Sequence, residues 1–246
     1  KGVINYEGNK YFTNKEGILQ TGWQQESGKY YYVDKETYKT ISGWKEIEGE
    51  TYYFDPTTKE RLQGIHEVEG NKYFFGVTKG KVMRGWINWN QNKYYTDPET
   101  GILKSNVTIL DDVPYFFGIN TNKLMKGVIN YEGNKYFTNK EGILQTGWYT
   151  ENGKHYYIDK ETYKAVSGWQ EIDNATYYFN NETKERAKGV TNIDGKYYFF
   201  GIKYGKQMSG WIYDGNLTYY ANPETKELAC ECTIIDGKKY FFGINT

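Results

Sequence analysis

Tryptophan is the residue type in this sequence whose spacing points to chemistry. Six of the seven tryptophans directly follow a glycine that recurs along the chain, and only Trp89 does not. A flat aromatic face can stack on the C–H face of a sugar, or attract a quaternary ammonium group through a cation–π interaction worth about 0.5–2 kcal/mol. The candidate ligand-binding residues are therefore Trp23, Trp44, Trp86, Trp89, Trp148, Trp169 and Trp211.

These tryptophans also have a purely structural interpretation. Val and Ile take the equivalent place in other repeats, so the rings could fill the core between neighbouring repeats instead of facing a ligand groove. If successive repeats rotate by about a third of a turn, repeats three apart face the same way. Trp23, Trp86, Trp148 and Trp211 would then form one stripe. Trp89 lies outside this pattern, and we expect it to be the more exposed ring.

No set of residues suits catalysis or metal binding. His66 and His155 align with Thr191 and Tyr30 in the other copy of the sequence, so neither belongs to a shared constellation. The carboxylates recur in predicted turns, and the spacings of calcium loops, zinc sites and phosphate-binding loops are absent. We expect no catalytic residue, no metal and no cofactor.

The charge balance excludes two classes of partner. Lys plus Arg and Asp plus Glu both number 31, so the formal net charge is +0. Nucleic acids and anionic lipid surfaces select basic proteins, which this is not. No apolar run approaches the roughly 20 residues of a transmembrane helix. We expect neither a nucleic-acid partner nor a membrane span.

The chain is one long block written twice. Residues 1–23 recur unchanged at 126–148, and the alignment at that offset continues to the last residue without a gap. The sequence predicts a single repeat domain over 1–246, a fragment of a larger protein, composed of block 1 at 1–125 and block 2 at 126–246.

A shorter period of 20 or 21 residues lies inside each block and gives twelve repeats in all. Six residues after each recurring glycine comes a turn-forming residue, as in Glu48-Gly49, and only Gln91 departs from the rule. Residues 43–48 before that turn alternate apolar and polar side chains, and 51–55 after it are aromatic. Both flanks are typical of strands joined by a tight turn.

A lone two-stranded hairpin is marginal in water, so each repeat must bury its rings against its neighbours. The predicted fold class is all-β, a β-solenoid of tandem β-hairpins with a screw-like rotation between repeats. Cys230 and Cys232 are two residues apart on a predicted strand, which suits a disulfide poorly. We interpret them as drifted repeat positions.

The repeat resembles a toxin family. GWKEIEGETYYFD at 43–55 and GWQEIDNATYYFN at 168–180 resemble the C-terminal combined repetitive oligopeptides (CROP) of the large clostridial glucosylating toxins, and the resemblance covers essentially the whole chain. It implies a secreted, non-catalytic domain for receptor and carbohydrate binding, with the glycosyltransferase elsewhere in the parent toxin. The implied partners are host cell-surface carbohydrate or a glycosylated receptor, and other domains of the toxin. The longer repeat that carries the toxins' sugar sites is absent here.

The same unit is also similar to the choline-binding and glucan-binding repeats of Gram-positive surface proteins. In those repeats the ligand sits between adjacent hairpins, in a cage of tryptophans and a tyrosine. This second resemblance implies a module for attachment to the cell wall. The second tryptophan of such a cage is replaced here by Tyr30, Thr51 or His155.

Overall fold

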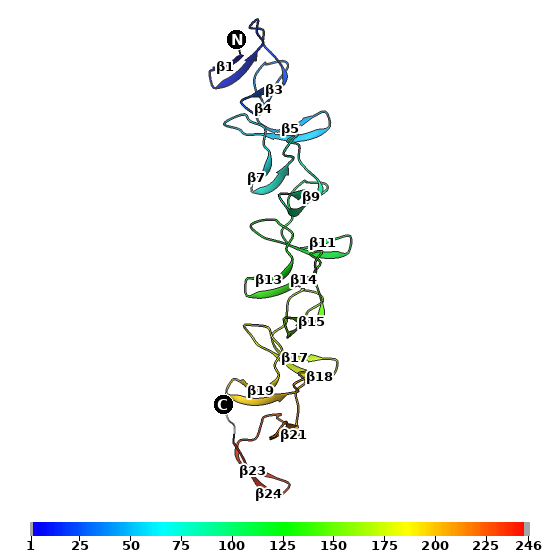
Figure 1. The fold of residues 1–246 in the computed structure, drawn as a ribbon. Coiled ribbons are helices and arrows are strands. Elements are labelled where there is room, and N and C mark those ends of the chain that lie inside the picture. The colour runs from blue at the N-terminus through cyan, green and yellow to red at the C-terminus, as the bar shows by residue number, and fades with distance from the viewer. Residues whose placement is uncertain (1, 244–246) are drawn as a thin grey trace. The chain divides into compact units, whose positions relative to one another are not determined.

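The computed structural model describes residues 2–243, all within β-hairpins and the loops that join them. Lys1 and residues 244–246, at the two ends of the predicted repeat domain, lie outside the described residues. The chain divides into two compact units, Lys1–Met125 and Lys126–Thr246, which we call block 1 and block 2. Within each block six hairpins follow one another in chain order (Figure 1).

Every strand has five residues and pairs antiparallel with one partner, which gives twelve two-stranded sheets over the described residues. The strands of block 1 are β1 (Gly2–Tyr6), β2 (Asn9–Thr13), β3 (Gly22–Glu26), β4 (Lys29–Val33), β5 (Gly43–Ile47), β6 (Glu50–Phe54), β7 (Gly64–Val68), β8 (Asn71–Phe75), β9 (Gly85–Trp89), β10 (Asn92–Thr96), β11 (Asn106–Leu110) and β12 (Val113–Phe117). The strands of block 2 are β13 (Gly127–Tyr131), β14 (Asn134–Thr138), β15 (Gly147–Glu151), β16 (Lys154–Ile158), β17 (Gly168–Ile172), β18 (Ala175–Phe179), β19 (Gly189–Ile193), β20 (Lys196–Phe200), β21 (Gly210–Asp214), β22 (Leu217–Ala221), β23 (Glu231–Ile235) and β24 (Lys238–Phe242).

The turns have the predicted form. Between β5 and β6, Glu48 and Gly49 take φ angles of 53° and 75°, the two positive values of a type I′ turn. Asn90 and Gln91 take 48° and 61°, although Gln91 is no turn former. Two-residue connections favour primed turns, whose backbone twist matches that of the strands, and the hairpin prediction is confirmed even where the turn residue is unusual.

The recurring glycine also needs a left-handed backbone. Gly43, the first residue of β5, has a φ of 75°. Two repeats lack the glycine, and there Asn106 and Glu231 take φ angles of 64° and 55°. The backbone conformation at the start of each repeat is therefore kept even without glycine, at some steric cost for Glu231.

Neighbouring hairpins are joined by loop residues rather than by a shared sheet. Arg61, in the loop after β6, forms a β-bridge with Phe54 of its own hairpin and donates its backbone N–H to the carbonyl of Tyr30 in the preceding hairpin at 2.8 Å. We call the residue at this position of each loop the cap residue. Eight of the caps make this bond and tie two successive hairpins together, and the predicted β-solenoid is confirmed within each block.

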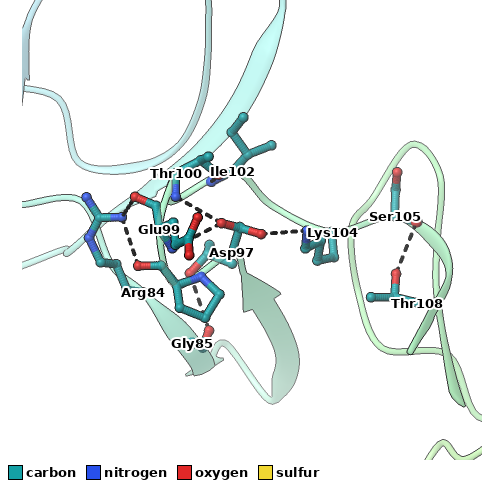
Figure 2. Close-up of polar contacts among 11 residues, drawn as sticks. Arg84, Gly85, Asp97, Glu99, Thr100, Ile102, Lys104, Ser105 and Thr108 are labelled. Carbon is teal, nitrogen blue, oxygen red and sulfur yellow. Dashed lines mark hydrogen bonds and ion pairs between the residues drawn. The ribbon is translucent and has the colours of Figure 1, made fainter. Parts of the chain in front are cut away.

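The loop over residues 97–103 shows how a cap is set in place (Figure 2). The Asp97 carboxylate accepts hydrogen bonds from the Lys104 ammonium at 2.8 Å and from the backbone N–H of Thr100 at 2.9 Å. These bonds hold the pKa of Asp97 well below its usual range. Arg84 of the preceding loop donates to carbonyls of this one. Hydrogen bonds of the same kind lower the pKa of Asp34, Asp55 and Asp159.

The core is a series of small clusters between neighbouring hairpins. In several repeats a phenylalanine that ends the second strand is completely buried, at 0 % exposure. The clusters each join a few residues from adjacent hairpins, as where Ile47, Tyr52 and Phe54 meet Tyr32 and Ile41. Stability in such a fold is a sum over neighbouring contacts. The fully buried phenylalanines are Phe54, Phe75, Phe117, Phe179 and Phe200.

Candidate ligand-binding sites

Each tryptophan that follows a recurring glycine belongs to a group of four rings. Trp23 on β3 faces Tyr32 on β4 across its own hairpin, with 5.2 Å between ring centroids. From the next hairpin, Tyr52 meets the same indole edge-on at 5.0 Å and Phe54 lies tilted against it at 5.9 Å. The group therefore straddles two successive hairpins.

The same group recurs at six tryptophans. We call each an aromatic site and name it by its tryptophan. The centroid distances from the tryptophan are 5.0–5.2 Å to its own hairpin's tyrosine, 4.9–5.2 Å to the next hairpin's tyrosine and 5.7–6.1 Å to the phenylalanine. The sites are Trp23 with Tyr32, Tyr52 and Phe54; Trp44 with Tyr53, Tyr73 and Phe75; Trp86 with Tyr95, Tyr115 and Phe117; Trp148 with Tyr157, Tyr177 and Phe179; Trp169 with Tyr178, Tyr198 and Phe200; and Trp211 with Tyr220, Tyr240 and Phe242.

These tryptophans lie at the joints between hairpins and also reach the surface. Five of the six are 37–43 % exposed, and Trp44 is half-buried. Each of these tryptophans thus packs in the core between hairpins, as the structural interpretation expects, and also exposes part of its ring, as a ligand groove requires. A ligand-binding role stays a prediction, as does the stripe of tryptophans three repeats apart.

Cations of the chain itself lie over three of the six sites. Arg61 Cζ is 5.7 Å from the centroid of Trp23, and Arg186 Cζ is 5.8 Å from that of Trp148. Lys93 Nζ is 4.0 Å from the centroid of Trp86. Positive groups at these distances are attracted by the ring quadrupole. Each of these three sites therefore already holds a positive charge.

At four of the sites the presence or absence of a cation over the indole follows from the cap residue. Arg61 and Arg186 are caps, whereas Val82 and Gln207 take the cap position at Trp44 and Trp169 and donate the same backbone hydrogen bond to the preceding hairpin. Within residues 2–243 no Lys or Arg lies over either of those indoles. We call the Trp23 and Trp148 sites arginine-capped and the Trp44 and Trp169 sites neutral-capped.

In the choline-binding repeats described above, a second tryptophan completes the cage. The residues that take its position in this chain lie next to the caps. Tyr30 lies under Arg61, with 4.3 Å between its ring centroid and Cζ. His155 takes the same place in block 2, where its Nδ1 is 2.8 Å from Thr150 Oγ1. Sequence reasoning singled out Tyr30, Thr51 and His155 but missed the next hairpin's tyrosine and the cap. The recurrence of arginine at both 61 and 186, one block apart, was the available signal.

Small grooves run beside the caps. Next to Val82 and Thr51 lies a cavity of about 290 Å³, lined also by Glu50 and Lys81, which form an ion pair of 2.5 Å. Beside Arg61 the corresponding cavity is about 390 Å³ and holds the Lys29–Glu60 pair at 2.6 Å. Neither cavity is lined by the tryptophan of its aromatic site, so these grooves flank the sites and are not part of them.

The expectation that Trp89 is the more exposed ring is wrong. Trp89 is half-buried, because it ends β9 at the turn and packs edge-on against Phe74 of the preceding hairpin at 5.2 Å. It forms one wall of a separate cavity of about 420 Å³, whose lining includes Met83, Ile87 and Lys79. Trp89 is thus part of a pocket that none of the aromatic sites shares.

The remaining reactive side chains do not converge. The Nε2 atom of His66 lies 2.8 Å from the carbonyl of Gln63, and Cys230 and Cys232 are free and exposed. Among residues 2–243 no group of His, Cys, Asp and Glu could hold a metal ion. The described part of the chain contains no helix long and apolar enough to cross a membrane.

Four repeats match a known sequence family. Its description is "Putative cell wall binding repeat", and the matched segments are residues 21–36, 42–57, 146–161 and 167–182. These segments carry the tryptophans of the two arginine-capped and the two neutral-capped sites. Comparison with curated proteins finds no match.

Solved structures from Streptococcus pneumoniae share the fold. CbpJ from strain TIGR4 aligns with a TM-score of 0.59 and 22% identity over 97% of both chains. Choline binding protein F, solved with a peptidoglycan analogue, aligns at 0.57 and 20% identity over 97% of this chain and 95% of that one. The modular autolysin LytC, solved with a synthetic peptidoglycan ligand, aligns at 0.51 and 18% identity over 90% of this chain and 51% of its own.

These findings favour the second of the two resemblances. Four repeats match the model of the cell wall binding repeat in sequence, and the fold is similar to that of pneumococcal choline-binding proteins. They give no support to an origin in a clostridial toxin.

Proposed function

We propose that this chain is a non-catalytic module for attachment to a bacterial cell wall, which binds quaternary ammonium groups such as choline in its aromatic sites. The observation that carries the proposal is the group of one tryptophan and two tyrosines, repeated at six joints with the indole partly exposed in each. The chain's own cations over three of these sites support it, because each lies at a distance from which an aromatic face attracts positive charge.

Repetition suits such a role. A single site of about millimolar affinity supplies only about 4 kcal/mol, but several sites on one chain gain avidity for a polymer that carries many ligands. The module would act outside the cell, where its target polymer is. Any catalytic activity would belong to another part of a longer protein.

The test is titration calorimetry with choline chloride and with dimethylbutanol, its uncharged isostere of nearly the same shape. We expect choline to bind about tenfold more tightly, since a cation–π contribution near 1.4 kcal/mol corresponds to that ratio. The chain should also be retained on a tertiary-amine resin and eluted by choline. Equal affinities, or no binding of choline, would contradict the proposal.

A matched pair of variants locates the binding. Trp169→Ala removes an indole from a neutral-capped site and should reduce the number of choline molecules bound. Tyr213→Ala removes a ring that is 76 % exposed and belongs to no aromatic site, so it should leave binding unchanged.

A sugar ring is the second candidate ligand, and the Trp89 cavity favours it. Its wall of Trp89, Phe74 and Met83 offers apolar surface for a sugar's C–H face, and Asn88 and Lys79 offer hydrogen-bond donors. The alignment of the blocks puts Asp214 at the place of Trp89. Trp89→Asp should therefore abolish any glycan binding at this cavity.

A glycan collection that contains both peptidoglycan fragments and mammalian glycans tests this second function. Binding of mammalian glycans that Trp89→Asp abolishes would revive a host-receptor role and with it the toxin resemblance. Binding of peptidoglycan fragments alone would add a second contact with the cell wall.

A further inference from the structure

The guanidinium group of Arg61 is held by more than ring contacts. Its Cζ lies 4.3 Å from the ring centroid of Tyr30 and 5.7 Å from that of Trp23. Its Nη2 donates a hydrogen bond of 3.1 Å to the carbonyl of Thr78 in the next loop. Gly80 in that loop makes room, because a Cβ there would lie 2.1 Å from Arg61 Nε. The side chain is thus clamped between two rings and the following loop.

Block 2 builds the same clamp. Arg186 Cζ lies 5.8 Å from the centroid of Trp148, and Nη2 donates to the carbonyl of Lys203 at 3.2 Å. A Cβ on Gly205 would lie 2.2 Å from Arg186 Nε. The clamp persists although His155 replaces the tyrosine beneath the first arginine. Its essential parts are therefore the indole, the arginine and the glycine of the next loop.

The two guanidinium groups have no anionic partner. Neither forms an ion pair within the described residues. The Nε atom of each is buried without a hydrogen-bond partner, and burial lowers the pKa of both side chains. A desolvated cation needs compensation, which here comes from the ring faces and one carbonyl. The capacity of these rings to stabilise a cation is already used.

The neutral-capped sites have the same rings without the cation. The indoles of Trp44 and Trp169 meet their neighbouring tyrosines at the same distances, but their caps are Val82 and Gln207. Here no guanidinium takes the place over the indole where an external cation would bind.

We propose that the cap residue decides which aromatic sites bind an external quaternary ammonium group. The arginine of an arginine-capped site is a built-in occupant that closes the site, and the neutral-capped sites are the ones that accept choline. This inference rests on the proposed function and specifies where that function resides. The Trp86 site stands apart, because its cap is the neutral Leu124 and the cation over its indole is the exposed Lys93 of β10, which makes no clamp.

The test exchanges caps between the two kinds of site and counts bound choline by titration calorimetry. The opened variant, Arg61→Val with Arg186→Gln, gives each closed site the cap of its neighbour. The closed variant, Val82→Arg with Gln207→Arg, does the reverse. Lys160→Gln is the control, because it removes an exposed cation that lies over no ring and forms no ion pair in the described part of the chain.

The opened variant should bind two more choline molecules per chain than the wild type, and the closed variant two fewer. The control should match the wild type. An opened variant that folds and keeps the wild-type number would overturn the inference while leaving the proposed function intact. If the opened variant does not fold, as judged by near-ultraviolet circular dichroism, the closed variant decides: an unchanged number overturns the inference.

Absence of binding to the wild type separates the two claims. If the wild type fails to bind choline and the opened variant binds it, the proposed function falls and the role of the cap stands. If neither protein binds, both fall.

Discussion

The Trp23 and Trp44 sites lie one repeat apart in block 1 and differ in a single decisive residue. Each has an indole, two tyrosines and a buried phenylalanine with nearly equal ring spacings. Over the first lies the guanidinium of Arg61, whereas Val82 caps the second. The rings are fixed by hairpin register, and the charge is set by the loop.

Block 2 repeats the comparison with other neighbours. There Arg186 caps the Trp148 site, and Gln207 caps the Trp169 site. A repeat protein can therefore keep one arrangement of rings and change, through one loop residue, whether a cation of the chain lies over the indole. The predictions below test whether the scaffold is common to both kinds of site and whether the cap is what separates them.

The largest effect is expected from the shared scaffold. Phe54→Ala and Phe75→Ala each remove a fully buried ring beneath one kind of site and should each lower the free energy of unfolding by about 3–5 kcal/mol. Denaturant titration measures this loss, and Phe241→Ala, at 75 % exposure, is the control with little expected change. A large loss at one site alone would show that the scaffolds differ.

The glycine against each cap gives the next effect. A Cβ at Gly80 would meet Arg61 Nε at 2.1 Å, and one at Gly101 would meet Val82 Cγ1 at 2.4 Å. Gly80→Ala and Gly101→Ala should each cost about 1–3 kcal/mol of stability through overpacking and a positive φ. Gly80→Ala alone should also displace the arginine and increase choline binding.

Gly70→Ala is the matched control for that prediction, because Gly70 has a φ of 77° and nothing within 4 Å of its would-be Cβ. This variant measures how much stability is lost from the positive φ alone, without overpacking. Equal losses for all three variants in denaturant would mean that the glycines do not confine the caps.

A smaller effect should appear with pH in block 2. Burial, followed by the charges of Arg186 and Lys188, lowers the pKa of His155 below its usual 6.5. The folded state then binds fewer protons than the unfolded state, so stability should fall as pH decreases from about 6.5 through the lowered pKa. His155→Tyr, which copies Tyr30, should remove this dependence. Unfolding midpoints across that pH range would reveal it, and an unchanged dependence in the variant would assign it elsewhere.

The smallest effect concerns the ion pairs beside the caps. Lys29–Glu60 flanks the arginine-capped site and Glu50–Lys81 the neutral-capped one, with the order of charges reversed. Exchanging both residues of either pair should leave stability and choline binding nearly unchanged, because exposed pairs contribute little. A marked change in choline binding would mean that this ion pair, and not the cap, determines whether the site binds choline.

Much of the scaffold could be predicted because the hairpins depend on residues that are close together in the sequence. Recurring glycines and period-two alternation specify hairpins such as β5–β6, and even Gln91 follows the turn of the other repeats. The exposure of Trp89 could not be predicted, since it has no counterpart in the repeat and its neighbour Phe74 comes from another hairpin. The caps were missed for the same reason: Arg61 reaches Trp23 only because its loop returns to the preceding hairpin.

The most direct test follows the indole N–H signals of the seven tryptophans by nuclear magnetic resonance as choline is added. The account predicts that the signals of Trp44 and Trp169 shift, whereas those of Trp23 and Trp148 stay in place. Equal shifts at all four, or none at the first two, would contradict it.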